Sequence, residues 1–336
     1  MSGKLNLPEH YTSKLSIMDT QLAIKLCKDT FEKKLAEKLC LTRVSAPLFV
    51  KPGTGLNDNL NGYERPVSFD IRDIKDNVQI VQSLAKWKRF ALKKYGFKPG
   101  TGLYTDMNAI RRDEDLDNLH SVYVDQWDWE KVITEDTRNT LTLEETVKLI
   151  VQALKETESI IRKEYPQLNP DIHDEVKFIT SQELEDLYPN FTPKERENEI
   201  CRKYKTVFVS QIGGKLNSGQ PHDGRSPDYD DWSMNGDILV WNPILKQSFE
   251  LSSMGIRVNS DSLMKQLKEK DAMDRCSCMY HKMLLKGELP LTIGGGIGQS
   301  RLCMLMLQTA HVGEVQVSIW PDEMIETCEK HGIHLL

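Results

Sequence analysis

The sequence predicts an α+β fold in which a mixed, mainly antiparallel sheet is flanked by helices. Segments that read as strands are joined in some places by short turns and in others by amphipathic helices, which favours a mixed sheet over a regular βαβ array. No internal repeat or low-complexity linker divides the 336 residues, so we expect one domain over residues 1–336. With 39% hydrophobic and 28% charged residues, the chain can form both a core and a polar surface.

The first half of the chain alternates helices with short strands. Apolar residues on one helical face predict a helix over 12–40, and LTRVSAPLFV at 41–50 reads as the strand after it. After a polar, glycine-rich loop, VSFDI at 67–71 looks extended. QSLAKWKRFALKKYG predicts a basic helix that ends at Gly96, and a strand, a charged loop and a second strand are expected over 102–133.

The second half continues this pattern. We expect helices over about 141–165, 192–205 and 260–287, and strands over 176–180, 206–212, 236–242 and 248–258. Pro193 suits the first turn of its helix. LTIGGGIGQSRLCMLMLQ at 291–308 reads as a glycine-rich turn that leads into a buried helix, and EVQVSIWP at 314–321 reads as a last strand.

The glycine-rich segment raises the question of a phosphate-binding loop. A Walker loop fails because Gly298 is followed by Gln299, and a dinucleotide fingerprint needs a glycine at that same position. The remaining interpretation is that bare backbone, including Gly295 and Gly296, lets a flat ligand lie on it. Arg301 would then stack on an adenine or hold a phosphate. The alternative is an ordinary helix start after a flexible turn.

Polar side chains recur inside the predicted strands. Alternation in SVYVDQWDWE places Gln126 and Asp128 on one strand face, and Asp237 and Glu250 lie on two strands that should pair. Burying such groups without partners is costly, so this face of the sheet should border a polar ligand, although an internal salt-bridge network is the alternative. Asp237 and Glu250 could hold Mg²⁺ together with nucleotide oxygens.

The residue types indicate which substrates such a site would bind. Arg111 and Arg301 would balance the charge of a polyphosphate. Acids and amides suit the ammonium group of an amino acid, and basic side chains suit its carboxylate. The candidates for these two roles are Asp58, Gln126 and Asp128 for the ammonium group, and Lys88 or Arg225 for the carboxylate.

Composition argues against several classes of protein. The net charge of −6 disfavours a protein that mainly grips nucleic acid, and no apolar run reaches the ~18 residues of a membrane span. MSGKLNLPEHYTSK lacks the apolar core of a signal peptide, and the seven cysteines lack framework spacing, so we expect a reducing cytoplasm. Cys276, Cys278 and His281 have no second ligand pair nearby, so no metal site is expected there.

Several motifs together resemble the class II aminoacyl-tRNA synthetases of the aspartate type. APLFV after a long helix is similar to their first motif, whose proline lies at a dimer interface. The segment LYTDMNAIRRDEDLDNLHSVYVDQWDWE is similar to the second motif, and GGGIGQSRLCMLML to the third, each of which carries an arginine for the nucleotide. More closely, HSVYVDQWDWE, SLAKWKR, PDYDDW, NGDILVWNP and FELSSMGIRV resemble the ammonia-dependent asparagine synthetases, the aspartate–ammonia ligases.

This resemblance implies a class II synthetase fold and an ATP-dependent ligase that makes L-asparagine from L-aspartate and ammonia through β-aspartyl-AMP. It implies an aspartate site made of Asp58, Ser83, Lys88, Gln126, Asp128, Arg225, Asp230 and Ser253. It implies an ATP site made of Arg111, Leu119, Ser121, Gly295, Gly296 and Arg301, with Asp237 and Glu250 holding Mg²⁺. The residues expected to act in catalysis are Asp58, Lys88, Arg111, Gln126, Asp128 and Arg301. Gln82 departs from the pattern, because a histidine is expected there.

The resemblance also sets the expected partners and the alternatives. We expect a single catalytic domain that forms a homodimer, with residues 1–11 as a flexible N-terminal extension and with neither a nucleic-acid nor a membrane partner. The first alternative is the catalytic domain of an aspartyl- or asparaginyl-tRNA synthetase. The second is a non-catalytic relative that senses an amino acid or a nucleotide, which should have lost Arg111, Arg301 or Glu250, yet all three are present.

Overall fold

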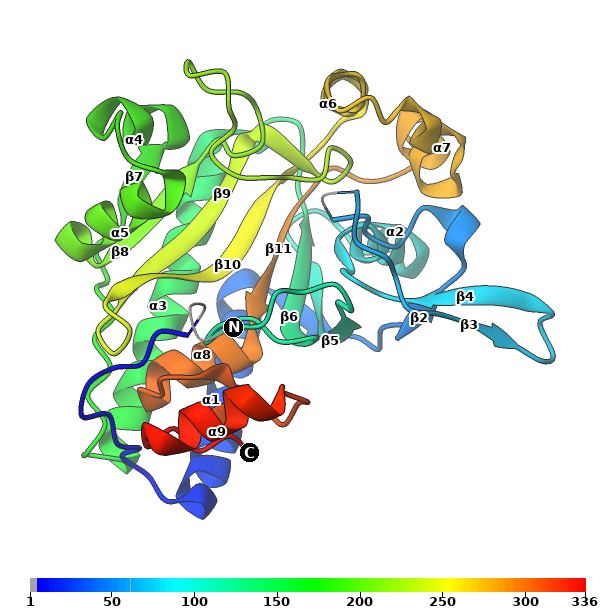
Figure 1. Cartoon of the computed structure of the whole chain (residues 1–336). Helices are drawn as coiled ribbons and strands as arrows, with labels where there is room; N and C mark the ends of the chain where they lie inside the picture. Colours follow the sequence, from blue (N-terminus) through cyan, green and yellow to red (C-terminus); the bar gives the residue numbers. More distant parts are fainter. Residues whose placement is uncertain (1–4, 61) are drawn as a thin grey trace.

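The computed structural model describes residues 5–60 and 62–336, and a large twisted sheet runs through it (Figure 1). Its strands are β1 (Leu41–Arg43), β5 (Gly102–Ile110), β6 (Tyr123–Val132), β7 (Lys177–Thr180), β8 (Thr206–Ser210), β9 (Asp230–Asn242), β10 (Gln247–Arg257) and β11 (Thr292–Gly298). Their order is β1-β5-β6-β11-β10-β9-β8-β7. The outermost pair at each end is parallel and the pairs between are antiparallel, so the predicted mixed, mainly antiparallel sheet is confirmed.

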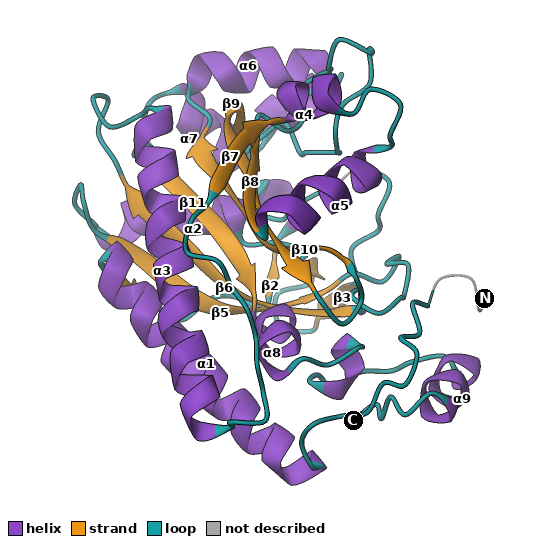
Figure 2. Ribbon diagram, turned by 90° about the vertical axis from the view of Figure 1, so that its left-hand side faces the viewer, coloured by secondary structure: helices purple, strands orange, loops and turns teal. Residues whose placement is uncertain are grey.

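Helices cover the sheet, as predicted. They are α1 (Ile17–Leu39), α2 (Ala85–Tyr95), α3 (Thr140–Glu164), α4 (Ser181–Leu187), α5 (Pro193–Tyr204), α6 (Ser260–Glu269), α7 (Met279–Leu285), α8 (Gln299–Leu307) and α9 (Asp322–Lys330). The long helices α1 and α3 run together along one face of the sheet (Figure 2). Within the described part of the chain, no helix is both long enough and apolar enough to cross a bilayer.

The alternation along β6 separates the core from the polar face. Trp127 and Trp129 are fully buried, and the ring centroid of Trp127 lies 4.9 Å from that of Phe31 on α1. Gln126 and Asp128 point to the opposite face. One strand therefore supplies aromatic packing to the α1–α3 layer and polar side chains to the other side of the sheet.

The segment 41–50 is not one strand. It forms β1 in the large sheet and, after Pro47, β2 (Phe49–Val50) in a separate small sheet with β3 (Ser68–Ile71) and β4 (Asp76–Ile80), in the order β2-β4-β3. The proline at the centre of the segment lacks the N–H that a continuous ladder requires, so the chain changes sheets there. The small sheet projects at the right of Figure 1.

Three other local predictions are wrong. The glycine-rich segment is strand β11 and not a turn, because β6 and β10 both pair with it. Residues 260–287 break into α6, the 3-10 turn η3 (Met273–Ser277) and α7. EVQVSIWP forms no strand: it begins in the 3-10 turn η4 (Val312–Glu314) and continues as a loop in which Ile319 is 88% exposed.

The start of the described chain packs on the body of the protein. Tyr11 donates a hydrogen bond of 2.8 Å to the buried carboxylate of Glu314. The Asn6 backbone N–H donates to Asn118 Oδ1 at 2.7 Å, and its side chain donates to the Leu245 carbonyl. Residues 5–11 of the expected flexible extension therefore make specific contacts, and residues 1–4 lie outside the described residues.

Candidate active site

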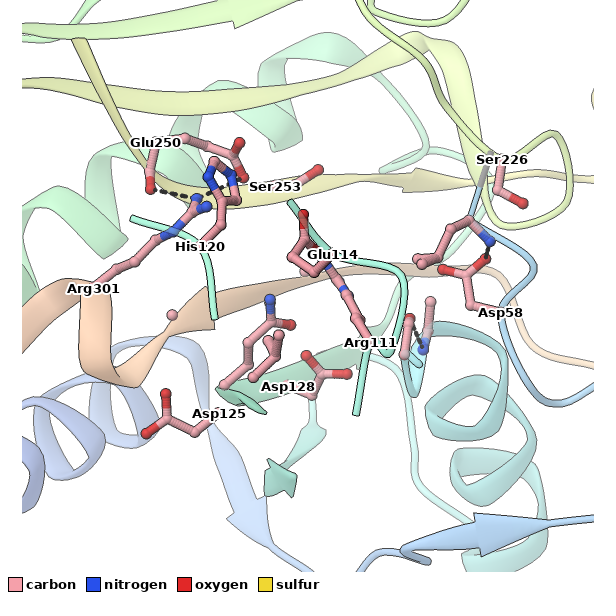
Figure 3. Close-up of a pocket in the computed structure, with 18 of the residues that line it drawn as sticks. Asp58, Arg111, Glu114, His120, Asp125, Asp128, Ser226, Glu250, Ser253 and Arg301 are labelled. Carbon is pink, nitrogen blue, oxygen red and sulfur yellow. Dashed lines mark hydrogen bonds and ion pairs between the residues drawn. The ribbon is translucent and has the colours of Figure 1, made fainter. Parts of the chain in front are cut away.

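A polar cavity of about 520 Å³ opens on the face of the sheet opposite α1 and α3. Its floor is formed by β6, β11 and β10, and its walls come from residues 58–60 and 63–64 and from the loops around residues 111–121 and 223–230. Figure 3 shows Arg301 and Glu250 at one end of the cavity, Asp58 and Ser226 at the other, and Asp128 and Arg111 between them. Of the predicted site residues, all but Asp237 line this cavity.

The glycines of β11 leave room for the polar side chains of β6. A Cβ atom added to Gly296 would lie 2.7 Å from Asp128 Oδ1 and 3.1 Å from Gln126 Cδ, well inside normal contact distances. Gly294 is similarly covered by Glu130 and Arg257. The glycines therefore allow neighbouring side chains to lie directly against the backbone of β11, and this backbone faces the cavity.

Arg301 lies in the first turn of α8, directly after this strand. Its Nη1 donates a hydrogen bond of 3.1 Å to the backbone carbonyl of Glu250 and lies 3.7 Å from Glu250 Oε1. Glu250 keeps 41% of its side chain exposed to the cavity. The guanidinium is thus held from one side, and its remaining donors are available to an anionic ligand.

Lys88 is a buried cation of the cavity floor. Its ammonium donates to the Gly295 carbonyl at 2.7 Å and lies 3.4 Å from Asp128 Oδ2. Burial lowers the pKa of Lys88, whereas Asp128 opposes that shift. A carboxylate ligand would add a second negative partner and keep this lysine charged.

A second buried ionic network supports the floor. Arg257 binds Glu130 at 2.7 Å and also pairs with Asp230, and Thr292 donates to Glu130 at 2.6 Å. Burial raises the pKa of Asp230, and Arg257 counteracts this. One oxygen of Asp230 is therefore fixed by Arg257, while the residue still lines the cavity.

Asp237 and Glu250 have the donor chemistry that Mg²⁺ prefers. Asp237 pairs with Arg225 through Oδ2, but its buried Oδ1 has no hydrogen-bond partner among the described residues. Burial raises the pKa of Asp237 to about 7, and the nearby Glu250 carboxylate contributes to the shift. A carboxylate oxygen without a partner, near a second carboxylate, has the donor chemistry to hold a hard cation, and the Mg²⁺ site stays a prediction. Asp237 itself lies behind Arg225, outside the cavity lining.

The loop between β5 and β6 closes the other wall. Arg111 Nη1 lies 3.8 Å from Glu114 Oε2, and its buried Nε has no partner among the described residues. Ser121 donates to Ser318 Oγ at 2.9 Å, and Leu119 lines the cavity beside it. Within this wall the guanidinium is paired only loosely, which leaves it able to bind a phosphate.

The comparisons with solved structures identify the fold. Asparaginyl-tRNA synthetase from Entamoeba histolytica, in complex with asparaginyl-adenylate, matches with a TM-score of 0.63 at 13% identity, over 89% of this chain and 66% of that chain. The enzyme from Pyrococcus horikoshii, complexed with asparaginyl-adenylate, matches with a TM-score of 0.63 at 14% identity, over 90% and 70%. The predicted class II synthetase fold is confirmed, and the chain spans about two thirds of these longer proteins.

Sequence comparisons decide the family. The profile described as aspartate-ammonia ligase matches residues 18–332. Relatives named aspartate–ammonia ligase are 59% identical over 334 residues in Clostridium perfringens and 58% identical over 335 residues in Lactobacillus acidophilus, with 99% of this chain covered in both cases. The chain belongs to the aspartate–ammonia ligase family. These matches include most of residues 1–11, which we expected to extend beyond the usual start.

Several residues of this ligase cavity were not predicted from the sequence, and Asp125 is one of them. Its carboxylate accepts from the Ser300 backbone N–H at 3.0 Å and from Ser300 Oγ at 2.8 Å, and it pairs with Lys28 at 2.9 Å. Gln316, from the segment wrongly expected to be a strand, also donates to it. An acid at the start of α8 is favoured by the helix dipole, but only the fold shows that β6 supplies it.

The position of the expected histidine holds a buried glutamine in this ligase. Gln82 is 1% exposed, and its side-chain amide nitrogen and oxygen have no partner among the described residues. Its backbone N–H donates to Asn57 Oδ1 at 2.8 Å, next to Asp58. Gln82 does not line the cavity, so its side chain acts at most through its neighbours Asn57 and Ser83.

Proposed function

We propose that this protein joins L-aspartate and ammonia at the expense of ATP and releases L-asparagine, AMP and pyrophosphate, through a β-aspartyl-AMP intermediate. One observation carries this proposal. A single cavity combines two loosely paired arginines, Arg301 at one end and Arg111 near the middle, with a buried lysine and three buried carboxylates. Family membership points to the same reaction.

Aspartate fits the end of the cavity near β6 and the 223–230 loop. Lys88 and Arg225 would bind its carboxylates, while Gln126 and Asp128 would accept hydrogen bonds from its ammonium group. Ser83, Asp230 and Ser253 complete the walls around it. Because Lys88 is fixed by the Gly295 carbonyl and Asp128, the substrate would meet a preorganised cation.

ATP fits the opposite end. The bare backbone of Gly295 and Gly296 would support the nucleotide, Leu119 and Ser121 would flank it, and Arg111 and Arg301 would bind its phosphates. Mg²⁺ held by Asp237 and Glu250 would supply charge neutralisation on the phosphate oxygens. The two arginines would also stabilise the negative charge that develops at the α-phosphorus.

The reaction then needs two displacements. A side-chain carboxylate oxygen of aspartate attacks the α-phosphorus and pyrophosphate leaves, giving the mixed anhydride. Ammonia next attacks the acyl carbon, and AMP leaves with the electrons of the broken C–O bond. Asp58 is the buried carboxylate that we propose takes a proton from the incoming nitrogen, because it lines the cavity and, unlike Asp128 and Asp230, has no basic partner among the described residues.

The direct test is an assay of products and nitrogen donors. With L-aspartate, ATP, Mg²⁺ and ammonium chloride we expect asparagine, AMP and pyrophosphate in equal amounts. Glutamine in place of ammonium should give little asparagine, since a glutaminase needs an activated nucleophile and a chamber that retains ammonia. ADP and phosphate as products, efficient use of glutamine, or transfer of the amino acid to added tRNA would each overturn the proposal.

We further propose a cytoplasmic homodimer that needs no nucleic-acid partner. The seven cysteines are all free thiols, which suits a reducing compartment. Apolar side chains are exposed on α1 and beside Pro47, among them Leu22 at 60% and Leu48 at 50%. Such side chains on the helix–proline segment would suit an interface with a second copy.

The dimer is tested by placing a charge in the proposed interface. Leu48→Asp should convert a two-fold dimer into monomers, because an isolated carboxylate buried in an apolar contact is costly. Sedimentation velocity at micromolar concentration measures the change. Leu187→Asp, at a leucine on α4 that is 59% exposed, is the matched control and should stay dimeric. An active wild-type monomer would contradict the proposal.

A further inference from the structure

A buried ionic cluster centred on Asp228 lies behind the amino-acid end of the cavity, and its charged side chains do not line the cavity. Asp228 Oδ2 accepts hydrogen bonds from Lys86 Nζ at 3.0 Å and Arg275 Nη1 at 3.1 Å, and it lies 2.9 Å from His281 Nε2. Its Oδ1 accepts from Ser226 Oγ at 2.8 Å. Two full positive charges and an imidazole thus surround one negative charge, and the cluster has a positive excess.

Asp58 is the cavity carboxylate that this excess can balance. The other buried aspartates of the lining each have a basic partner: Asp125 has Lys28, Asp128 has Lys88 and Asp230 has Arg257. Among the described residues no cation pairs directly with Asp58, which is only 2% exposed and accepts from the Leu60 backbone N–H at 3.0 Å. Such a carboxylate is costly unless nearby charge compensates it.

The loop that carries Asp58 is fixed to the same cluster. Gly55, at φ +70°, packs so closely on α7 that an added Cβ would lie 2.7 Å from Cys278 Cβ and 3.1 Å from His281 Nδ1. Asn57 donates to the Ile80 carbonyl at 3.2 Å and accepts from the Gln82 backbone, just before the helix that bears Lys86. Both contacts lie within the three residues that precede Asp58.

We propose that Lys86, Asp228 and His281 are positioning residues for Asp58: His281 packs against its loop, Lys86 supplies positive charge to its carboxylate, and Asp228 holds Lys86 and His281 in place. This inference rests on the proposed function, in which Asp58 takes the proton of the incoming nitrogen. In that step ammonium gives one proton to Asp58, and the resulting lone pair forms the C–N bond. The acyl C–O bond breaks toward AMP, and the nitrogen then loses a second proton to water.

The charges facing Asp58 have opposing effects. Burial raises the pKa of Asp58 and the Asp228 charge adds to this, whereas Lys86 and Arg111 lower it. Tyr229 lines the same cavity, and the Asp58 charge adds to the effect of burial in raising the pKa of its phenol. Because the pKa of Asp58 is raised, its basic form is lost as pH falls through that value. Removing Lys86 should therefore move the loss to higher pH, and neutralising Asp228 should move it to lower pH.

The test compares Lys86→Met, Lys86→Arg and Asp228→Asn with the wild-type enzyme. One readout is the pH dependence of kcat at saturating ammonium, which reports ionisation in the substrate complex. The other is aspartate-dependent exchange of pyrophosphate into ATP without ammonium, which reports only adenylate formation. We expect the acidic limb of the kcat–pH profile to shift to higher pH by about one unit in Lys86→Met and to lower pH in Asp228→Asn. The profile of Lys86→Arg should resemble that of the wild type.

The rate of pyrophosphate exchange should stay within about twofold of wild type in every variant. Exchange reports adenylate formation, whereas the pKa of Asp58 affects only the later attack of the nitrogen. The inference would be overturned if pyrophosphate exchange fell in parallel with asparagine synthesis. It would also be overturned if the acidic limb of the kcat–pH profile did not move, or if it moved in the same direction in Lys86→Met and Asp228→Asn. If one variant does not fold, the direction in which the acidic limb of the other variant shifts still tests the inference. A wild-type enzyme without aspartate-dependent exchange would instead overturn the proposed function itself.

Discussion

Arg301→Lys is expected to lower kcat for asparagine synthesis by about 10²-fold or more. Lysine keeps the charge but has neither the planar fork nor the stacking face of a guanidinium. The present fork is held by the Glu250 carbonyl at 3.1 Å, and a lysine cannot keep that contact while also bridging two phosphate oxygens. Steady-state assays of AMP release measure the change.

The same substitution at a surface site provides the control. Arg202→Lys, on the outer face of α5 where Arg202 pairs with Glu199, should leave activity unchanged. The melting temperature of both variants should match wild type, because Arg301 is partly exposed and does not belong to the core. Near-normal turnover of Arg301→Lys would mean that the β11–α8 junction serves the fold alone.

Gly294→Ala is expected to lower the free energy of unfolding by roughly 3–5 kcal/mol, the range found when a buried ion pair is broken. The new Cβ would lie 2.6 Å from Glu130 Cδ and 2.7 Å from Arg257 Nη2. Neither side chain can move away freely, since Thr292 and Asp230 hold the pair from both sides. Urea denaturation followed by tryptophan fluorescence measures the loss.

Gly214→Ala is the matched control for this effect. An added Cβ at Gly214 would have nothing within 4 Å, so the stability of that variant should stay within about 0.5 kcal/mol of wild type. Equal stability of Gly294→Ala and Gly214→Ala would show that the Glu130–Arg257–Asp230 network can rearrange without cost. In that case the network could not be the rigid support of the cavity floor.

Elements with a clear period or a clear end signal could be predicted from the sequence. Helix α5 begins at Pro193 with Thr192 and Glu195 forming a capping box, and α2 ends at Gly96, so local chemistry sets both boundaries. The polar alternation of Gln126 and Asp128 likewise survives folding, because two residues along a strand always return to the same face. These signals also located most of the cavity floor.

The failures have physical causes as well. A glycine run lacks the β-branched side chains that are typical of strands. Strand β11 forms because its backbone pairs with β6 and β10 on either side. VQVSI alternates like a strand, but in the fold Gln316 is bound to Asp125 and Ser300, so the segment stays a loop. The Asp228 cluster joins Lys86 to a histidine 195 positions later in the sequence, and no local pattern announces such a pairing.

The position of β11 in the sheet has a consequence for how the chain is made. Strand β11 is the last of the sheet in sequence and lies between β6 and β10, so until residue 298 is in place the sheet consists of two halves, β1-β5-β6 and β10-β9-β8-β7. Each half then presents an open edge, which is a hazard for aggregation and slows folding through long-range pairing. Closing that gap joins the halves and creates the floor of the cavity in one event. A chain that ends before this strand therefore lacks a complete cavity floor and has two unpaired strand edges.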